Sequence, residues 1–326
     1  MASWLAPALT ARTFLLGRRS MDFRDSHRER RVRMEIWYPA GRGLPRAVES
    51  SAWVRRPEVR DAPVVAGRHP LVLLSHGHHG TLGDPSSLIW LTDRLVAAGY
   101  VVVAPWHRDP HKGNVHIEHW HRPLDISAAL DEVLNSPLAN SIDASRVGFV
   151  GYSLGGATGL WLAGARAQHY RRTIDPGTRY IPPHPRTAER ERYIDYLRQS
   201  TDFEAAARSY RDGRISNFFL LAPALGWAFS DSSLAAIDRP VSIVVGDRDE
   251  FLVPATNALH FAAKIPGARC RVFKGADHGV FLSRIAPETV RKRPELRELA
   301  QDPPGVSREA VHRVVGKLLI EFLRRP

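Results

Sequence analysis

The sequence has 326 residues, of which 44% are hydrophobic and 25% charged, as is usual for a globular protein with a full hydrophobic core. No apolar run approaches the length that crosses a bilayer, so we expect no transmembrane segment. The formal net charge is +12, but the arginines are spread along the whole chain without a zinc knuckle or a helix-turn-helix pattern, and we therefore expect no specific nucleic-acid partner.

The cysteine count and the N-terminal residues bear on cellular location. Cys270 is the single cysteine, which excludes an intrachain disulfide and removes any need for an oxidising compartment. Residues 1–19 are mildly apolar, yet no basic residue precedes the apolar stretch and Arg12 interrupts it, so we expect no cleavable signal peptide. These features favour a cytoplasmic protein, with secretion as the alternative.

From about residue 32 onward, short β-rich runs alternate with helical stretches, and several runs are continuous in Val, Leu and Ile. This pattern predicts an α/β fold with a mostly parallel central sheet and helices on both faces. The predicted strands are 32–39, 70–77, 100–106, 146–153, 218–224, 241–247 and 270–275. The predicted helices are 86–99, 124–134, 154–167, 255–265 and 307–325. We expect one domain over residues 1–326.

One long segment interrupts the alternation. Residues 165–216 separate the helix that follows residue 153 from the next strand, and they combine loop material with a charged helical passage. Long insertions in enzymes of this kind often cover the active site. We therefore predict a helical, lid-like insertion over 165–216 within the single domain.

The strongest chemical signal is the G-x-S-x-G pattern around Ser153, which follows a predicted strand and precedes a Gly- and Ala-rich helix. Gly151 and Gly155 allow the strand and the helix to approach closely around a strained residue, so that the serine hydroxyl is exposed at the carboxyl end of the sheet. The pattern therefore predicts Ser153 as a catalytic nucleophile.

A serine nucleophile needs a base and an acid, which in this type of site follow it along the chain in the order acid, then base. His278 follows the strand 270–275 and is the predicted base. Asp249 lies in the turn after the strand 241–247, where its carboxylate can reach sideways to the histidine. We prefer it to Asp247, which is better placed to cap the turn, and we expect a turn role for Asp277 as well.

Stabilisation of an oxyanion requires two backbone N–H groups. Leu154, which follows the nucleophile, is expected to supply one, and His78, after the tight turn at Gly77, is expected to supply the other. Side chains near these positions and near the end of the strand 100–106 are expected to line the substrate pocket: His79, Trp106, His107, Tyr152 and Phe251. An aromatic and basic rim there would favour an anionic or phospholipid-like substrate.

The chain between residues 107 and 121 is rich in histidine, and HIEHWH is close to a zinc-binding pattern. It lacks helical spacing, cysteine ligands and a supporting cluster of acidic residues. We therefore expect no catalytic metal and no cofactor, and we expect these histidines to line or support the pocket.

Taken together, several segments resemble the dienelactone-hydrolase-like α/β-hydrolases and the bacterial relatives of platelet-activating-factor acetylhydrolase, which are serine esterases. The resemblance extends from about residue 35 onward and rests on PLVLLSHGHHG, RPLDISAALDEVL, RVGFVGYSLGGAT, VVGDRDEFL and GADHGVFL. It implies the α/β-hydrolase fold and a triad of Ser153, Asp249 and His278, with the oxyanion hole at the His78 and Leu154 amides. True dienelactone hydrolases carry a cysteine nucleophile, so their substrate is not implied.

These observations lead to one functional expectation and two alternatives. We expect cofactor-free hydrolysis of a small-molecule carboxylic ester, with a small to medium acyl group carried on Ser153 as an acyl-enzyme. An amidase, a thioesterase or a polyester hydrolase would use the same triad. A protein of another class, a binding protein on a hydrolase fold that has lost catalysis, would have no need of the strained turn at the serine.

Overall fold

The computed structural model describes residues 14–47, 51–78, 83–108, 111–112, 115–174 and 188–325. Within them, one nine-stranded sheet runs through the molecule in the order β11-β10-β9-β8-β4-β5-β2-β1-β3. Its strands are β1 (Leu15–Asp25), β2 (Arg30–Ala40), β3 (Val59–Arg60), β4 (His69–Ser75), β5 (Val101–Pro105), β8 (Ile142–Tyr152), β9 (Ile215–Leu221), β10 (Val241–Gly246) and β11 (Arg269–Phe273). A separate hairpin pairs β6 (His111–Lys112) with β7 (Val115–His116).

The centre of the sheet is parallel and fully buried. Neighbouring strands in the row β5-β4-β8-β9-β10-β11 all pair in parallel, whereas β2 pairs antiparallel with both β5 and β1. The apolar runs of β4, β5 and β8 are buried on both faces, which explains why they are continuous and not alternating. All seven predicted strands are present, so the prediction of a mostly parallel α/β sheet is confirmed.

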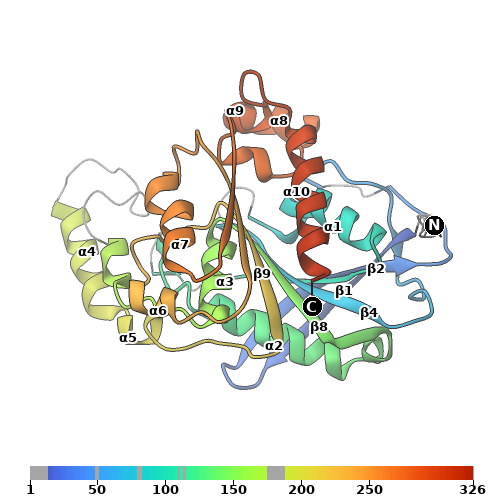
Figure 1. Cartoon of the computed structure of the whole chain (residues 1–326), viewed down its shortest axis with the longest axis horizontal. Coiled ribbons are helices and arrows are strands. Elements are labelled where there is room, and N and C mark those ends of the chain that lie inside the picture. The colour runs from blue at the N-terminus through green and yellow to red at the C-terminus, as the bar shows by residue number, and fades with distance from the viewer. Residues whose placement is uncertain are drawn as a thin grey trace, which may run out of the picture.

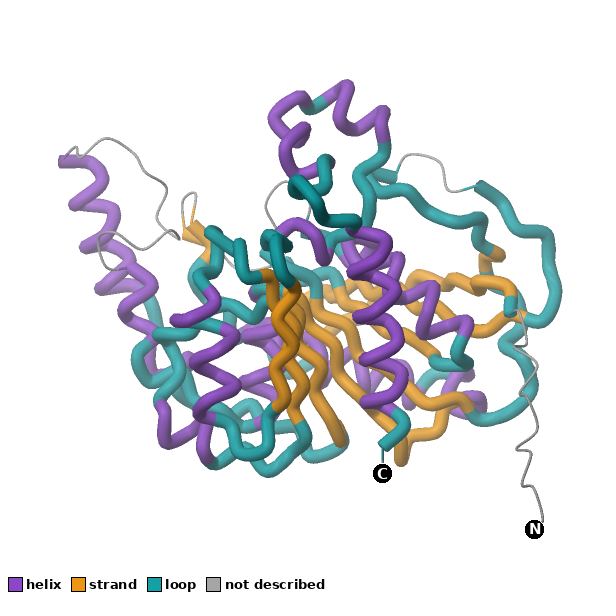
Figure 2. The backbone as a smooth tube through the Cα atoms, turned by 45° about the horizontal axis from the view of Figure 1, so that its top comes forward, coloured by secondary structure: helices purple, strands orange, loops and turns teal. Residues whose placement is uncertain are grey.

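Helices cover both faces of this sheet (Figures 1 and 2). They are α1 (Ile89–Ala97), α2 (His121–Asn135), α3 (Leu154–Ala163), α4 (Ala188–Ser200), α5 (Phe203–Ala206), α6 (Asp231–Ala235), α7 (Ala258–Lys264), α8 (Pro287–Lys292), α9 (Arg297–Ala300) and α10 (Arg308–Leu323). Two successive residues of β8 contact different helices. A Cβ on Gly148 would meet Leu323 of α10, whereas the next residue, Phe149, packs against Gly159 of α3. Successive residues of a strand point to opposite faces, so α10 and α3 lie on opposite sides of the sheet.

The segment 165–216 lies at the end of the molecule far from β1 and β2 (Figure 1). Its described part contains a 3₁₀ turn at Tyr170–Ile174 and the helices α4 and α5. Ile194 and Leu197 of α4 form a small apolar cluster with Ile117 and Ile174, separate from the main core. Residues 175–187 lie outside the described part of the chain.

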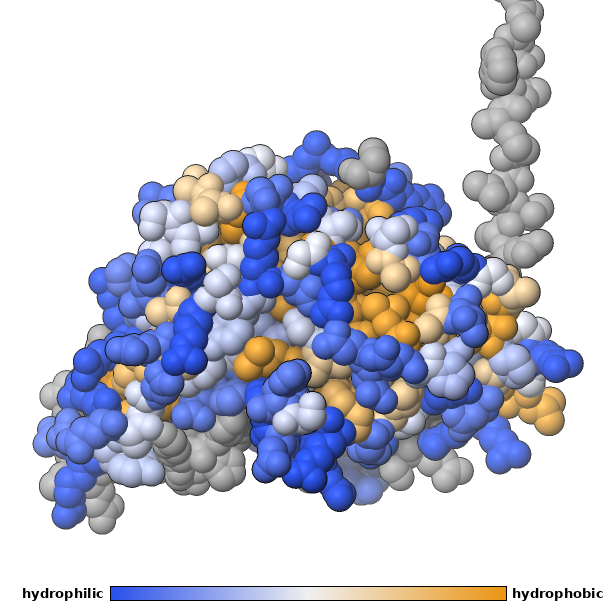
Figure 3. Space-filling model, turned by 90° about the horizontal axis from the view of Figure 1, so that it is seen from below, coloured by the Kyte–Doolittle hydropathy of each residue, from blue (hydrophilic) through white to orange (hydrophobic). Residues whose placement is uncertain are grey.

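The surface is largely hydrophilic on the face shown in Figure 3, where polar side chains surround a smaller apolar area. This agrees with a net charge of +12 that is spread along the sequence. Among the described residues, no helix is both long and apolar enough to pass through a bilayer.

Candidate active site

Ser153 sits at the sharp turn between β8 and α3. Its backbone has φ 54° and ψ −116°, a conformation that costs free energy for any residue with a side chain. The turn is fixed because the Ser153 N–H donates to the Leu221 carbonyl at 2.9 Å and the Ser153 carbonyl accepts from the Ala224 N–H at 3.0 Å. A strained serine between a strand and a helix is the geometry of a nucleophile elbow.

The glycines on either side of Ser153 are required by close packing. A Cβ on Gly151 would lie 2.1 Å from the carbonyl oxygen of Gly155. A Cβ on Gly155 would lie 2.0 Å from the carbonyl oxygen of Ser75 at the end of β4. Both distances are far below van der Waals contact, so these positions accept only glycine, and the helix that follows Ser153 is held directly against the sheet.

His278 and Asp249 lie together at the carboxyl ends of the strands. The Nδ1 atom of His278 is 2.7 Å from Oδ2 of Asp249, and the other carboxylate oxygen accepts from the Leu252 N–H at 2.7 Å. A carboxylate only accepts hydrogen bonds, so Nδ1 carries the proton and Nε2 is left as a free base in the neutral ring. His278 can therefore accept a proton from a hydroxyl group.

The two neighbouring aspartates have turn roles. Asp247 Oδ1 accepts from the Gly275 N–H at 2.6 Å, which connects the end of β10 to the turn after β11. Asp277 Oδ1 accepts from the Val280 N–H at 2.9 Å. Both contacts agree with the roles expected from the sequence, and of the three aspartates Asp249 is the one whose carboxylate contacts His278.

Two aromatic residues flank the His278 ring. The ring centroid of Tyr152 lies 5.0 Å away and that of Phe251 5.2 Å away. The Tyr152 hydroxyl donates to the His278 carbonyl at 3.1 Å, and burial raises the pKa of this phenol well above its ordinary value, so it remains neutral. Phe251 is 54% exposed and presents an apolar surface beside the histidine.

The loop after β4 packs against the nucleophile. A Cβ on Gly77 would lie 3.6 Å from the Ser153 Cβ and 3.1 Å from the Tyr152 ring, so this loop passes directly over the elbow. His78 follows and, with Gly77, lines the same cavity as Ser153. Leu154 is the first residue of α3. The predicted oxyanion donors thus belong to the two segments that border the serine, whereas His79 lies outside the described residues.

A cavity of about 790 Å³ opens at Ser153 and His278. Its apolar lining consists of Tyr152, Phe251, Leu282, Leu296, Leu299 and Pro303. Its charged lining consists of Glu250, Asp277, Glu295 and Glu298, with Arg248 as the one described cation. The described rim is therefore aromatic and acidic, not basic as the sequence suggested, because the surplus of arginines lies elsewhere on the surface.

Two residues assigned to the pocket from the sequence are placed elsewhere. The Trp106 indole N–H donates to Glu35 Oε1 at 3.2 Å, and neither Trp106 nor His107 is among the residues that line the cavity. His107 is completely buried beneath the loop after β4. The Trp106 side chain thus packs against β2, whereas His107 contacts Ser75 at the end of β4.

The outer wall of the cavity comes from a segment that the sequence did not single out. Residues 295–303 line it, whereas no described residue of 165–216 does, so a lid role for 165–216 stays a prediction. Arg308 of α10 holds this wall, since its guanidinium donates to the carbonyls of Leu299 at 2.9 Å and Ser283 at 3.2 Å, among others. In the part of the chain that the structure describes, no three His, Cys, Asp or Glu side chains are grouped as metal ligands.

A parallel α/β sheet with a strained serine turn at its carboxyl edge, followed in sequence by an aspartate and a histidine, is the architecture of the α/β-hydrolase class. The sequence profile of the alpha/beta hydrolase family matches residues 71–292, more than half of the chain. The chain belongs to this family.

Similar proteins include two cutinases of Thermobifida alba, est1 and est2. Each is 35% identical to this chain over 99 residues, which is 29% of this chain and 30% of the cutinase. The aligned part thus spans less than a third of these relatives. Among solved structures, a ferulic acid esterase from Streptomyces cinnamoneus has a TM-score of 0.62 at 18% identity, covering 98% of this chain and 91% of its own. That likeness extends to the whole fold.

Proposed function

We propose that this protein is a serine hydrolase that cleaves carboxylic esters through an acyl-enzyme on Ser153. The observation that carries the proposal is the strained turn at Ser153, which opens on the same cavity as a histidine hydrogen-bonded to a buried aspartate. Membership of the alpha/beta hydrolase family supports it, as does the partial similarity to two cutinases.

The proposed reaction uses only groups of the protein and water. His278 Nε2 removes the hydroxyl proton as Ser153 Oγ attacks the acyl carbon, and Asp249 stabilises the imidazolium that forms. The N–H groups of His78 and Leu154 bind the oxyanion of the tetrahedral intermediate. His278 then returns the proton to the leaving alcohol, and a water molecule, activated in the same way, releases the acid.

Substrate size and chemistry follow from the cavity. Its apolar residues suit small to medium acyl groups, and Phe251 offers a surface for an acyl or aromatic group next to His278. A polyester is the second candidate, favoured by the similarity to cutinases, since Phe251 and Val253 are both about half exposed near the site.

Within the family, the motifs of the sequence favour kinship with the dienelactone-hydrolase-like and acetylhydrolase-like esterases. The free thiol of Cys270 supports a cytoplasmic location.

The proposal is tested by turnover of p-nitrophenyl acetate and butyrate, together with labelling by a fluorophosphonate. We expect the wild type to turn over and to label, and Ser153→Ala to do neither. Ser145→Ala removes an exposed serine hydroxyl elsewhere and should keep both activities. A folded wild type that neither labels nor turns over would overturn the proposal and favour a binding protein on this fold.

A further inference from the structure

Arg122 is a completely buried arginine on α2 that contacts the loop after β4. Its guanidinium donates from Nη1 to the carbonyl of His76 at 2.8 Å and from Nη2 to the carbonyl of Gly77 at 3.1 Å. Both carbonyls belong to the loop that leads into His78. A cation that is buried at this depth is costly, so its position beneath the proposed oxyanion hole calls for a physical explanation.

The Gly77 carbonyl receives a second hydrogen bond from the preceding residue. The backbone N–H of His107 donates to Nε2 of His76 at 3.2 Å, so this ring nitrogen carries no proton. In the neutral ring the proton then resides on Nδ1, which lies 2.8 Å from the Gly77 oxygen and donates to it. One carbonyl oxygen thus accepts from both Arg122 and His76.

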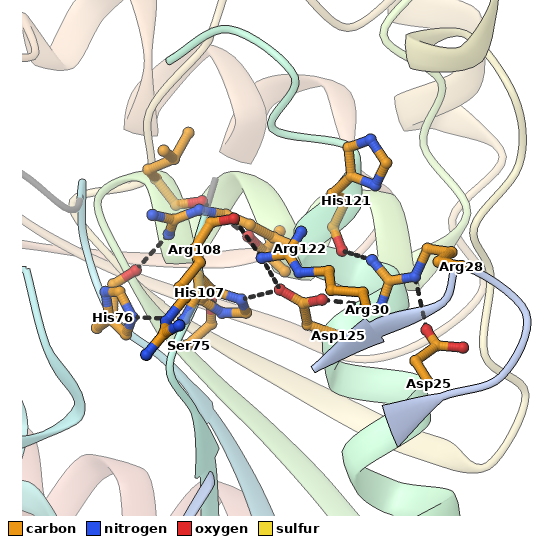
Figure 4. Close-up of polar contacts among 12 residues, drawn as sticks. Asp25, Arg28, Arg30, Ser75, His76, His107, Arg108, His121, Arg122 and Asp125 are labelled. Atoms are coloured by element: carbon orange, nitrogen blue, oxygen red, sulfur yellow. Dashed lines mark hydrogen bonds and ion pairs between the residues drawn. The ribbon is translucent and has the colours of Figure 1, made fainter. Parts of the chain in front are cut away.

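A buried array links Asp125, which like Arg122 lies on α2, to the end of β4 where this loop begins (Figure 4). His107 contacts Asp125 Oδ2 through Nδ1 at 3.0 Å and Ser75 Oγ through Nε2 at 2.9 Å. Burial opposes ionisation of Asp125, but the hydrogen bond from His107 and the charges of Arg30 and Arg28 outweigh it and lower the pKa of this carboxyl. The array has the composition of a Ser-His-Asp triad, yet all three members are completely buried, so it braces the end of β4 and meets no substrate.

The peptide group between Gly77 and His78 is the link to catalysis. Its carbonyl accepts from Arg122 and His76, and its N–H is the proposed oxyanion donor. Hydrogen bonds to an amide carbonyl polarise the whole amide and strengthen its N–H as a donor, and a nearby positive charge adds to this in a site of low dielectric constant. We propose that Arg122 is a positioning residue that fixes and polarises the Gly77–His78 peptide, so that its N–H stabilises the transition state. This inference rests on the proposed function.

The test compares Arg122→Met, which removes the charge, with Arg122→Lys, which keeps the charge but cannot form both hydrogen bonds. Each is assayed with p-nitrophenyl butyrate and with an alkylboronic acid, whose tetrahedral adduct on Ser153 places an oxygen in the oxyanion hole. For Arg122→Met we expect kcat to fall roughly 10²–10³-fold, as for loss of one oxyanion donor, with KM within about threefold. The Ki of the boronic acid should rise by a similar factor, and Arg122→Lys should fall in between.

Arg18→Met is the matched control for removal of a largely buried, ion-paired arginine, since the Arg18 side chain is 12% exposed. Arg18 lies on β1 and pairs with Glu35 and Glu58, away from the loop after β4. The Arg18→Met variant should have a lower thermal midpoint of unfolding, while its kcat and its Ki for the boronic acid stay near the wild-type values.

A lowered thermal midpoint in a folded Arg122→Met with unchanged kcat and Ki would overturn the inference, because a purely structural brace predicts that result. If Arg122→Met does not fold, the same comparison of kcat with Ki in Arg122→Lys decides. If the wild type itself neither turns over nor binds the boronic acid, the proposed function fails. If the wild type does both and the Arg122 variants match it, the inference alone fails.

Discussion

Asp249 and His278 are joined by a 2.7 Å hydrogen bond between a carboxylate that is entirely buried and an imidazole that borders the cavity. The aspartate is shielded by its own turn, where the Leu252 N–H occupies the second oxygen. The histidine is partly open on the side that faces the cavity. The proton on Nδ1 is therefore fixed by a group that solvent does not reach, while Nε2 remains available for the proposed proton transfer.

Replacement of Asp249 by Asn should remove most of the activity. An amide can donate to Nδ1 and thus favour the tautomer that carries its proton on Nε2, so we expect kcat to fall roughly 10³–10⁴-fold with little change in KM. Asp247→Asn is the matched control, because Asp247 contacts Gly275 and not the histidine; its kcat should stay within about tenfold of wild type. Equal losses in the two variants would show that the chosen acid is incorrect.

Gly155→Ala should destabilise the protein strongly. The added methyl group would lie 2.0 Å from the Ser75 carbonyl, which is backbone and cannot turn away. We expect the free energy of unfolding, measured by urea denaturation, to decrease by at least about 3 kcal/mol. Gly213→Ala, where a Cβ meets nothing within 4 Å, should change it by no more than about 0.5 kcal/mol. A loss below 1 kcal/mol for Gly155→Ala would mean that strand and helix can separate at low cost.

His312 should make the protein less stable in acid. It stacks on Trp90 with ring centroids 3.7 Å apart, and its Nε2 lies 2.8 Å from the Val280 carbonyl. Burial, with the nearby charges of Arg308 and Arg94, lowers the pKa of His312 from 6.5 to about 3 despite the hydrogen bond to Val280 and the charge of Asp302. The folded state therefore keeps this ring neutral between pH 6.5 and 3, where the unfolded state binds a proton.

The sign follows from that difference in bound protons. Between these two pH values each unit of acidification should remove up to about 1.4 kcal/mol through His312. His312→Gln keeps a donor for the Val280 carbonyl but does not titrate, so its free energy of unfolding should fall less steeply than that of wild type from pH 6.5 to 4. His27→Gln, at an exposed histidine, should follow the wild-type slope. Parallel slopes for His312→Gln and wild type would contradict the prediction.

The acidic lining of the cavity should disfavour negatively charged substrates. Mono-p-nitrophenyl glutarate and p-nitrophenyl pentanoate have similar length and differ in a terminal carboxylate. With four described carboxylates and one described arginine at the cavity, we expect kcat/KM for the glutarate to be lower by about tenfold at low salt, and the gap to narrow in high salt.

The variant that checks this preference for the uncharged ester combines Glu250→Gln with Glu298→Gln. It should reduce the difference in kcat/KM between the pentanoate and the glutarate at low salt. Glu321→Gln on α10 is the control for a carboxylate that does not line the cavity, and it should leave the ratio unchanged. A glutarate that is hydrolysed as fast as the pentanoate by the wild type would show that the acyl group does not approach these carboxylates.

The sequence predicted those parts of the fold and site that depend on local pattern. The central strands were evident because both faces are buried, which makes their apolar runs continuous. The turn at Ser153 was predicted correctly because it demands glycines at fixed spacing, while the role of Ser153 as nucleophile stays a prediction. Asp249 and His278 followed from their positions after successive strands, and the structure brings their side chains into contact.

What the sequence did not predict depends on contacts between distant residues or on very short elements. β1 has polar residues throughout its length and forms through pairing with β2. The wall at 295–303 includes α9, which has four residues and is too short for a periodic pattern. Trp106 and His107 follow β5 as expected, but the course of the chain beyond β5 directs Trp106 to Glu35 on β2 and buries His107, so neither lines the cavity. Arg122 was noted only within a motif, because nothing in its neighbours indicates which carbonyls it will reach.

The attachment of the cavity wall to Arg308 bears on the order in which the parts of the site form during protein synthesis. The turn at Ser153, the loop after β4, Asp249 and His278 all precede α10 in the sequence, so they are synthesised before it. Until then the carbonyls of Ser283 and Leu299 lack the guanidinium of Arg308, and the wall is held by apolar packing of residues such as Leu296. We therefore expect the cavity at Ser153 to take its final shape only after α10 has docked.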